Sequence, residues 1–577
     1  RYMNKFKQIC MKAHTEKKEA LHNLYTDRHR YLSSVSSSEQ PVEDEKLFHY
    51  RNVVFQFCGT GFRTMQQMIL FIWIPETSVI GGNPVGRCRT AYEDWLLRLL
   101  SEAVNELSDS LQNDHKDARE KTEFSMQTTS SVVAGRNGCL YAAERHAFRL
   151  RINFRVPLIN GNVINGKSTY RETKNMLDCI CDRLEAMDRL ALSEHVRLYE
   201  DQLEIRDFLR ESGLAAFVAD GSVLPRQADT DAPMEGAVPF RSPESLRVTL
   251  TLSDGKKLTG MGLRRGITVI TGGGYSGKST LLDSLEQGIY FHVKGDGREY
   301  VATDETACKV YAEDGRVVSD TDISPFFTYL PGDRELRAFR THHASGSVSQ
   351  AVNIVEAAYG GSRCLLIDED TSATNFMIRD EIMRSLVKKE PIIPYTDRIL
   401  ELKEQGISTI LVIGGSGEYL KYADHLLLLE DYHVLDATEE LTPWRQTGTP
   451  ETAQAPQWMR HKTLPSLPMT DLFFGERIEI ENAKYIKIGG CVADITRLTA
   501  LADSDQINSL TWLLENLLGE KETEQTELRD RCQAAAGSLL SDTFDTVLAS
   551  RTHQYELWLE EVRGLDLLMA ACRLRGC

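Results

Sequence analysis

Several segments alternate apolar and polar residues with a period of two, which predicts strands with one buried face. One such segment covers 145–155, and 246–252 repeats the pattern before Asp254-Gly255, a dipeptide typical of hairpin turns. Residues 267–271 instead form a continuous β-branched run, as expected of a strand buried on both faces. A helical pattern begins directly after the glycine-rich residues that follow this run.

Polar and proline-bearing stretches divide the chain into parts. We expect a helical extension with a linker at 1–47, an α+β domain at 48–210, an α/β domain at 211–440, and a proline-bearing linker with a C-terminal domain at 441–577. In the last part the pattern predicts a strand at 477–488 and helices through 510–518 and 553–572.

Composition narrows the class of protein. The 577 residues carry a net charge of −17, which argues against a protein that coats polyanions along its whole surface. Any contact with nucleic acid must therefore come from a local basic patch. The longest apolar run, 68–74, is far too short to span a bilayer, so we expect no membrane partner. The cysteines lack the paired spacing of a zinc site.

One segment fits the phosphate-binding pattern G-x-x-x-x-G-K-[ST] between a strand and a helix, the context that such a loop needs. Its residues are Gly272, Gly273, Gly274, Tyr275, Ser276, Gly277, Lys278, Ser279 and Thr280. The glycines let backbone N–H groups turn onto phosphate oxygens. Lys278 is expected to reach the β- and γ-phosphates, and Ser279 to ligate Mg²⁺. The segment therefore predicts ATP and Mg²⁺ as cofactors, and a chance match is disfavoured because both flanks are correct.

Two adjacent carboxylates follow the apolar run 364–367. At the end of a strand, Asp368 would lie beside the glycine loop and hold Mg²⁺ through water. Glu369 points elsewhere and is expected to act as the general base on the attacking water. Alone this pattern is weak, but behind a phosphate-binding loop it predicts hydrolysis.

A Ser-Gly element opens an apolar helix ahead of the carboxylate strand. Ser345, Gly346, Ser347 and Gln350 belong to it, and a polar turn follows the carboxylates at 370–375. Serine and glycine at a helix start favour an anion. This order of elements is that of ABC-type ATPases rather than P-loop kinases. The predicted fold class is α/β, with an ABC-type P-loop ATPase core, an added N-terminal α+β domain and a small C-terminal α+β domain.

Five blocks resemble the family called "predicted ATPase of the ABC class": 217–226, 272–280, 344–350, 365–380 and 413–417. The resemblance spans roughly 130–510, and the block LLIDEDTSATNFMIRD is specific to that family. Within the family, the chain is most similar to kinetoplastid mitochondrial members associated with RNA editing. The resemblance implies a mitochondrial homodimer with ATP at the dimer interface, RNA in a pore built partly by the N-terminal domain, and protein partners from an RNA-processing complex.

The chain departs from ABC ATPases at two places. Val348 and Ser349 separate Ser347 from Gln350, where the usual element reads LSGGQ. The switch histidine that usually follows the next strand is missing, since residues 414–417 read Gly-Gly-Ser-Gly. We expect Ser416 to take the γ-phosphate-sensing position and turnover to be slow. His425, which has apolar neighbours, is interpreted as structural.

Arginines occupy the polar side of the alternating segment 145–155. Arg145, Arg149, Arg151 and Arg155 are candidates for RNA binding, with Arg136 as a further loop candidate. Guanidinium groups match phosphate geometry. From charge alone, a solvated face paired with acids is the better interpretation, whereas the family resemblance favours single-stranded, uridine-rich RNA.

Two classes of function remain open. The first is an ATPase whose ATP-dependent homodimer binds or remodels RNA, and Glu369 favours it. The second is an ATP-gated scaffold that hydrolyses little and presents a surface to other proteins, which the missing switch histidine keeps open. A P-loop kinase is weaker, because no arginine-rich lid follows the loop.

Overall fold

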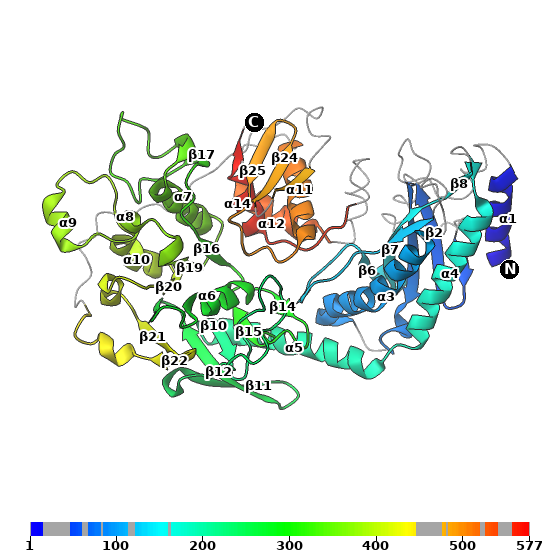
Figure 1. Ribbon diagram of the computed structural model, residues 1–577, viewed down its shortest axis with the longest axis horizontal. Coiled ribbons are helices and arrows are strands. Elements are labelled where there is room, and N and C mark those ends of the chain that lie inside the picture. The colour runs from blue at the N-terminus through cyan, green and yellow to red at the C-terminus, as the bar shows by residue number, and fades with distance from the viewer. Residues whose placement is uncertain are drawn as a thin grey trace. The chain divides into compact units, whose positions relative to one another are not determined.

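The fold is described from a computed structural model (Figure 1). It describes residues 2–15, 47–59, 67–81, 85–112, 122–159, 163–445, 476–480, 483–519, 526–540 and 557–575. The chain forms two compact units, and each is described by itself. Unit 1 comprises Arg1–Arg197 with Gly537–Glu561, and unit 2 comprises Leu198–Ala536 with Val562–Cys577. Residues 16–46 of the expected N-terminal extension and linker, and residues 446–475 of the expected proline-bearing linker, lie outside the described residues.

Unit 1 is built on an antiparallel sheet in the order β1-β2-β3-β7-β4, with β6 also paired to β7. The strands are β1 (Phe48–Tyr50), β2 (Val53–Gly59), β3 (Gln67–Pro75), β4 (Glu123–Ser125), β6 (Cys139–Ala142) and β7 (Ala147–Arg155). The apolar run at 68–74 is therefore strand β3. Of the alternating segment at 145–155, residues 147–155 form β7, as the pattern predicts, whereas Arg145 ends a short 3-10 turn and His146 has φ +47°.

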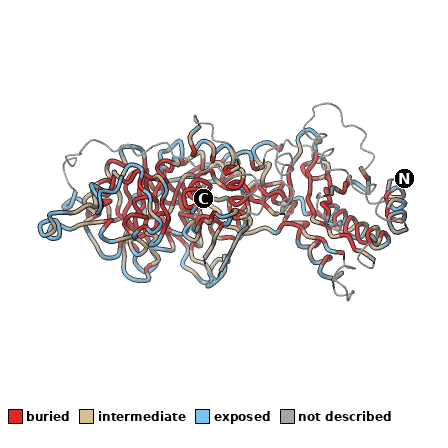
Figure 2. The backbone as a smooth tube through the Cα atoms, turned by 90° about the horizontal axis from the view of Figure 1, so that it is seen from above, coloured by how far each residue is buried: buried red, intermediate tan, exposed pale blue. Residues whose placement is uncertain are grey.

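Three helices cover the apolar face of this sheet: α1 (Tyr2–Thr15), α3 (Arg89–Gln112) and α4 (Gly166–Glu185). One core cluster joins Phe6 of α1, Leu96 of α3 and Ile180 of α4 to Phe148 and Ile152 of β7. Helix α5 (Arg189–Glu211) follows. Buried residues lie inside each unit and exposed residues at its periphery (Figure 2). Among the described residues, no helix is long and apolar enough to cross a membrane.

Unit 2 contains a six-stranded sheet in the order β16-β19-β20-β13-β21-β22, parallel up to β21. Its strands are β13 (Ile267–Gly272), β16 (Ala307–Val310), β19 (Cys364–Asp368), β20 (Ser408–Val412), β21 (His425–Glu430) and β22 (His433–Asp436). Ile270 and Asp368 both pair with Val412 in the register. Because these parallel strands end at the same edge, the loops after β13, β19 and β20 meet there.

Alternating residues of the central strands face opposite sides of the sheet. Val269 and Ile367 pack against α7 (Gly346–Tyr359) and α10 (Tyr395–Glu404). Ile270 and Leu366 pack against α6 (Lys278–Gln287) and against a second sheet. The order of that sheet is β11-β12-β10-β15, from β10 (Leu214–Ala219), β11 (Arg247–Thr251), β12 (Lys257–Arg264) and β15 (Val301–Thr303). The hairpin predicted at Asp254-Gly255 is confirmed, with Gly255 at φ +87°.

The rest of unit 2 includes the short helices α8 (Thr374–Met377) and α9 (Glu381–Leu386) and the pair β17 (Arg316–Thr321) and β18 (Phe339–Ala344). A small antiparallel sheet has the order β23-β24-β25-β26. It contains β23 (Glu476–Ile480), β24 (Ala483–Ile488), β25 (Cys491–Asp494) and β26 (Leu574–Arg575), with α11 (Ser504–Gly519), α12 (Leu528–Ser538) and α14 (Gly564–Ala571) nearby in the sequence. The single strand expected at 477–488 is wrong, because two strands pair there. The helix expected at 553–572 is limited to α14 in the described residues.

Candidate nucleotide site

The glycine loop joins β13 to α6 through backbone conformations that glycine adopts readily. Gly272 has φ +149° and Gly277 has φ +97°. A Cβ atom on Gly272 would lie 2.4 Å from the carbonyl oxygen of Leu429, so no larger residue fits without displacement. Lys278 Nζ donates to the carbonyl oxygens of Gly272 and Gly273, at 2.8 and 2.7 Å. The ammonium group therefore lies over the loop, where a phosphate chain would pass.

The tip of the loop is open to solvent. Gly273 and Gly274 have nothing within 4 Å of a Cβ position. Tyr275 is 98% exposed and has φ +60°, a left-handed conformation that is unfavourable for a tyrosine. Ser276 is buried, whereas Thr280 is half-buried on the first turn of α6. These exposures leave the backbone N–H groups of the tip available to an anion.

Ser279 and Asp368 face each other at the edge of the sheet. Ser279 Oγ donates to Asp368 Oδ2 at 3.2 Å. The other oxygen, Oδ1, accepts from the backbone N–H of Asp370 at 3.1 Å, which fixes the carboxylate. Hydroxyl and carboxylate oxygens suit Mg²⁺, which takes its other ligands from phosphates and water. No group of three or more His, Cys, Asp or Glu side chains in the described part of the chain could hold a metal by itself.

Glu369 is held by the loop after β20. Its Oε2 accepts hydrogen bonds from the N–H groups of Gly414 and Gly415, at 2.6 and 2.9 Å. Ser416, next in this loop, accepts a hydrogen bond from Glu418 N–H at 3.3 Å, and among the described residues its own O–H has no acceptor. Burial, then the charge of Glu369, raises the pKa of Tyr419. His425 lies in β21, and burial lowers its pKa, consistent with a structural role.

The Ser-Gly element has one exposed and two inward-facing side chains. Ser345 is exposed and caps α7, accepting from Val348 N–H at 3.5 Å. Ser347 Oγ donates to Asn375 at 2.8 Å. Gln350 is fully buried, donates to Ser372 Oγ at 2.9 Å, and accepts from Ala373 N–H at 2.8 Å. Ser347 and Gln350 therefore connect α7 to the turn at 370–375.

The Ser-Gly element and the glycine loop are not joined within one chain. In the described part of the chain, no hydrogen bond links residues 272–280 to residues 345–350. The neighbours of Gly346 are instead Ala312, Asp314 and Ala373. The candidate ATP ligands therefore form two separate groups.

An apolar cavity that the sequence did not reveal adjoins the glycine loop. Its volume is about 230 Å³, and Ser276, Gly277 and Thr280 line one wall. The opposite walls include Met234, Val238, Phe240 and Tyr432. Tyr432 lies against the loop, because a Cβ on Gly277 would be 3.4 Å from its ring. The sequence signal for this cavity is the set of apolar residues between Pro225 and Phe240. These residues are far from the glycine loop in sequence, so the sequence alone does not show that they lie beside it.

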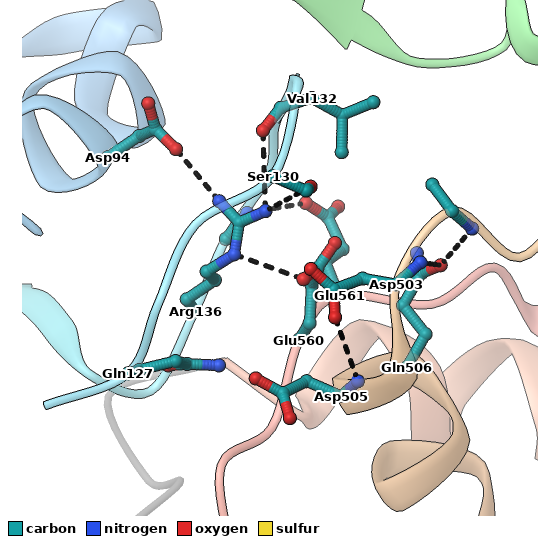
Figure 3. Close-up of polar contacts among 12 residues, drawn as sticks. Asp94, Gln127, Ser130, Val132, Arg136, Asp503, Asp505, Gln506, Glu560 and Glu561 are labelled. Carbon is teal, nitrogen blue, oxygen red and sulfur yellow. Dashed lines mark hydrogen bonds and ion pairs between the residues drawn. The ribbon is translucent and has the colours of Figure 1, made fainter. Parts of the chain in front are cut away.

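Arg136, an RNA candidate, is buried within unit 1 (Figure 3). Its guanidinium donates to Asp94 at 2.8 Å and to Glu560 at 3.0 Å. Further bonds go to Ser130 and to the carbonyl oxygen of Val132. Burial alone would raise the pKa of Asp94, but the hydrogen bond with His195 and the charges of Arg98 and Arg136 lower it. In this structure the guanidinium of Arg136 is therefore occupied by partners within unit 1.

The arginines in β7 and just before it differ in exposure. Arg149 and Arg151 lie on the face of β7 opposite its apolar residues, but they are buried, which contradicts the expected open face. Arg149 stacks on Phe71 at 4.8 Å, and Arg151 stacks on Trp558 at 4.8 Å. Arg145 is half-buried over Trp73, at 4.5 Å. Arg155 is 38% exposed and lies 3.7 Å from Glu123.

Comparison with known proteins supports this description of unit 2. Residues 188–463 match the model of the ABC_ATPase family, described as a P-loop domain. An uncharacterized protein of Methanocaldococcus jannaschii is 33% identical over 254 residues, which cover 41% of this chain and 55% of the relative. The Fe(3+) ion import ATP-binding protein FbpC of Pseudomonas fluorescens is 31% identical over 112 residues, or 19% of this chain and 29% of the relative. The chain thus matches about half or less of each curated relative's length.

Solved structures show weaker similarity. CbiO1 from Clostridium perfringens, part of an ABC transporter complex, has 16% identity and a TM-score of 0.24, covering 40% of this chain and 91% of that one. An ATP-binding cassette of an ABC transporter in its ADP conformation has 14% identity and a TM-score of 0.23, covering 34% and 92%. The family model, the sheet order and the glycine loop together define the class: residues 188–463 contain an ABC-type P-loop ATPase domain.

Proposed function

We propose that this protein hydrolyses ATP between two copies of the chain and couples that cycle to RNA. The observation that carries the proposal is the position of Glu369, fixed by Gly414 and Gly415 next to the Ser279–Asp368 pair. A carboxylate fixed beside a metal-ligating pair is what hydrolysis of a phosphoanhydride requires.

Each residue of the site has a distinct role in this proposal. Lys278 moves from the carbonyl oxygens of the loop to the β- and γ-phosphates. Ser279 and Asp368 hold Mg²⁺, which supplies positive charge to the phosphate oxygens. Glu369 accepts a proton from the attacking water through Oε1, because Oε2 already accepts two backbone hydrogen bonds. The adenine base enters the apolar cavity beside Gly277 and Tyr432.

A second copy completes the site. Ser345 caps α7 and is exposed to solvent. Within one chain it is not joined to the glycine loop, so it would not contact a phosphate bound there. Donors at a helix start favour an anion, so we assign Ser345, Gly346 and Ser347 to the γ-phosphate bound by the other copy. ATP then stabilises the dimer and hydrolysis weakens it, since a ligand that binds only the paired state favours pairing.

Slow turnover follows from the loop at 414–417. Ser416 offers a neutral hydroxyl where a histidine is usual, and a hydroxyl donates a weaker hydrogen bond to phosphate than a charged ring. In the scaffold alternative, the protein binds ATP but hydrolyses almost none of it. It is distinguished by ATP-driven dimerisation without release of phosphate.

RNA binding, mitochondrial location and the kinship with kinetoplastid RNA-editing proteins rest on the family resemblance. Arg155 at the end of β7 and Arg145 just before this strand keep exposed area, so they are the primary candidates for phosphate contacts. We propose single-stranded, uridine-rich RNA as the ligand, and partners from an RNA-processing complex.

The test is steady-state ATPase activity with and without uridine-rich RNA, alongside light scattering with and without ATP. ATP-dependent dimerisation with RNA-stimulated phosphate release supports the proposal. Phosphate release by a species that stays monomeric at saturating ATP contradicts the shared site, and unchanged turnover with RNA contradicts the coupling.

A further inference from the structure

A second cavity in unit 2 lies apart from the glycine loop. Its volume is about 450 Å³, within the range of sites for small ligands. The residues that line it come from the start of β17 and the turn before it, from β24, from β25 and the residues just after it, and from β26 and the residue before it. They include Glu313, Asp314, Arg316, Tyr485, Asp494, Thr496, Arg497, Arg573 and Arg575. Four arginines thus border one cavity in a chain of net charge −17.

Two of these arginines are buried and only partly satisfied. The side chains of Arg316 and Arg573 are 2% and 3% exposed. Arg573 donates to Glu313 at 2.6 Å and to Asn353 at 2.9 Å, and Arg316 donates to Asn353 and Glu356. Among the described residues, the Nε–H of each has no hydrogen-bond partner. These two Nε atoms are themselves closed off from solvent, so what Arg316 and Arg573 offer to a ligand in the cavity is the positive charge of guanidinium groups that line it.

The remaining two arginines are exposed at the rim. Arg497 lies over the ring of Tyr311 at 5.4 Å, and Arg575 ends the strand that pairs with β25. Neither forms an ion pair among the described residues. Asp314 and Asp494 also line the cavity. The rim therefore offers both cationic donors and carboxylate acceptors, together with the half-buried ring of Tyr485.

We propose that this cavity binds a ribonucleotide unit, either a free mononucleotide or a nucleotide of an RNA strand. Guanidinium groups bind the phosphate. Asp314 and Asp494 accept hydrogen bonds from ribose hydroxyls, which a simple anion lacks. The ring of Tyr485 provides a surface for the base. The mixed charge of the lining distinguishes this ligand from inorganic phosphate.

A ligand bound in the cavity would influence the Ser-Gly element through helix α7. Asn353 and Glu356 lie on α7, the helix that Ser345 caps. Both buried arginines donate to Asn353, and Arg316 also donates to Glu356. A ligand that draws Arg316 or Arg573 toward the cavity therefore acts on α7. The N-terminus of α7 is the part that we propose contacts the γ-phosphate. This second step rests on the proposed function. Coupling is reciprocal, so ATP-bound dimers should bind the ribonucleotide with altered affinity.

The binding test uses the full chain carrying Lys278→Ala, which weakens the ATP site. The probes are AMP, a uridine-rich oligonucleotide and inorganic phosphate, titrated by calorimetry. The double variant Arg497→Glu and Arg575→Glu removes the exposed donors without altering the buried pair. The matched control is Arg334→Glu with Arg337→Glu, an equal charge change at exposed sites of the same unit.

We expect AMP or the oligonucleotide to bind at least about tenfold more weakly to the double variant, from loss of charge-assisted hydrogen bonds, and unchanged to the control. If AMP binds, a free mononucleotide is sufficient as the ligand of the cavity. If only the oligonucleotide binds, the ligand is a nucleotide within an RNA strand. Absence of binding by both, equal weakening in the control, or equal affinity for phosphate would overturn the proposal. These results do not depend on dimerisation, so failure here is distinguishable from failure of the proposed ATPase cycle.

Discussion

Glu369 accepts a hydrogen bond from the backbone N–H of Gly414 at 2.6 Å, which connects the end of β19 to the loop after the neighbouring strand β20. The proposed general base and the loop that lacks a switch histidine are therefore in direct contact. A shift of the loop on phosphate release would displace the carboxylate. This contact gives a physical reason to examine both residues by mutation.

Glu369→Gln should abolish most turnover while preserving ATP binding. The amide keeps the size of the side chain but cannot accept a proton from water, and a general base contributes about 100-fold or more. Phosphate release and ATP affinity, measured on the same sample, check this. A variant that retains more than roughly a third of wild-type turnover would show that another group is the base.

Ser416→Ala should slow turnover by roughly tenfold and weaken ATP-driven dimerisation, because the hydroxyl that is free to donate to the γ-phosphate is lost. Stopped-flow phosphate release and light scattering provide the two readouts. Ser385→Ala, a change at an exposed serine of α9, serves as the control. If the rate and the dimer are both unchanged, Ser416 does not sense the phosphate.

Much of the ATPase core could be predicted from local pattern. The run at 267–271, the glycine loop and the carboxylates at 368–369 lie in short segments whose chemistry is local, and the parallel sheet brings them to one edge. The cavity beside Tyr432 could not be predicted, since Met234 and Tyr432 meet only through the fold. For the same reason, the alternation of β7 predicted which side its arginines occupy but not that Trp558, from far along the chain, covers Arg151.

Tyr432→Ala should raise the KM for ATP by roughly three- to tenfold and leave kcat unchanged, since a lost aromatic contact weakens ground-state and transition-state binding equally. Leu435→Ala is the control, because Leu435 is also exposed on β22 but does not line the cavity. Steady-state kinetics separate the two constants. An unchanged KM would exclude the cavity as the base site.

Arg136→Ala should destabilise unit 1 by about 3–5 kcal/mol, because it leaves Asp94 and Glu560 buried with one partner fewer. Chemical denaturation monitored by tryptophan fluorescence checks this. Arg334→Ala, at an exposed position, should change stability little. Wild-type stability with reduced RNA affinity would instead assign Arg136 to RNA.

The same cluster sets an acid limit on stability. The pKa of Asp94 is lowered from 3.8, despite its burial, by His195, Arg98 and Arg136. At pH values above the ordinary pKa of Asp, the ionised form of Asp94 therefore stabilises the folded state. This stability is lost as the pH falls through the lower pKa that Asp94 has in the folded state. Denaturation midpoints across pH 2–5, roughly the range of Asp titration, should fall less steeply in Asp94→Asn than in wild type. An identical slope would contradict the lowered pKa.

RNA binding by β7 is tested at Arg155, the arginine within this strand that is not buried. Arg155→Glu should weaken binding of uridine-rich RNA and reduce the slope of affinity against salt by about one, since one phosphate contact is lost. Glu123→Arg, which reverses the charge of the acid 3.7 Å from Arg155, should strengthen binding through the same phosphate. Fluorescence anisotropy over a salt series measures both variants. Equal salt slopes in both variants and the wild type would remove β7 from the RNA site and leave unit 2 as the region to examine.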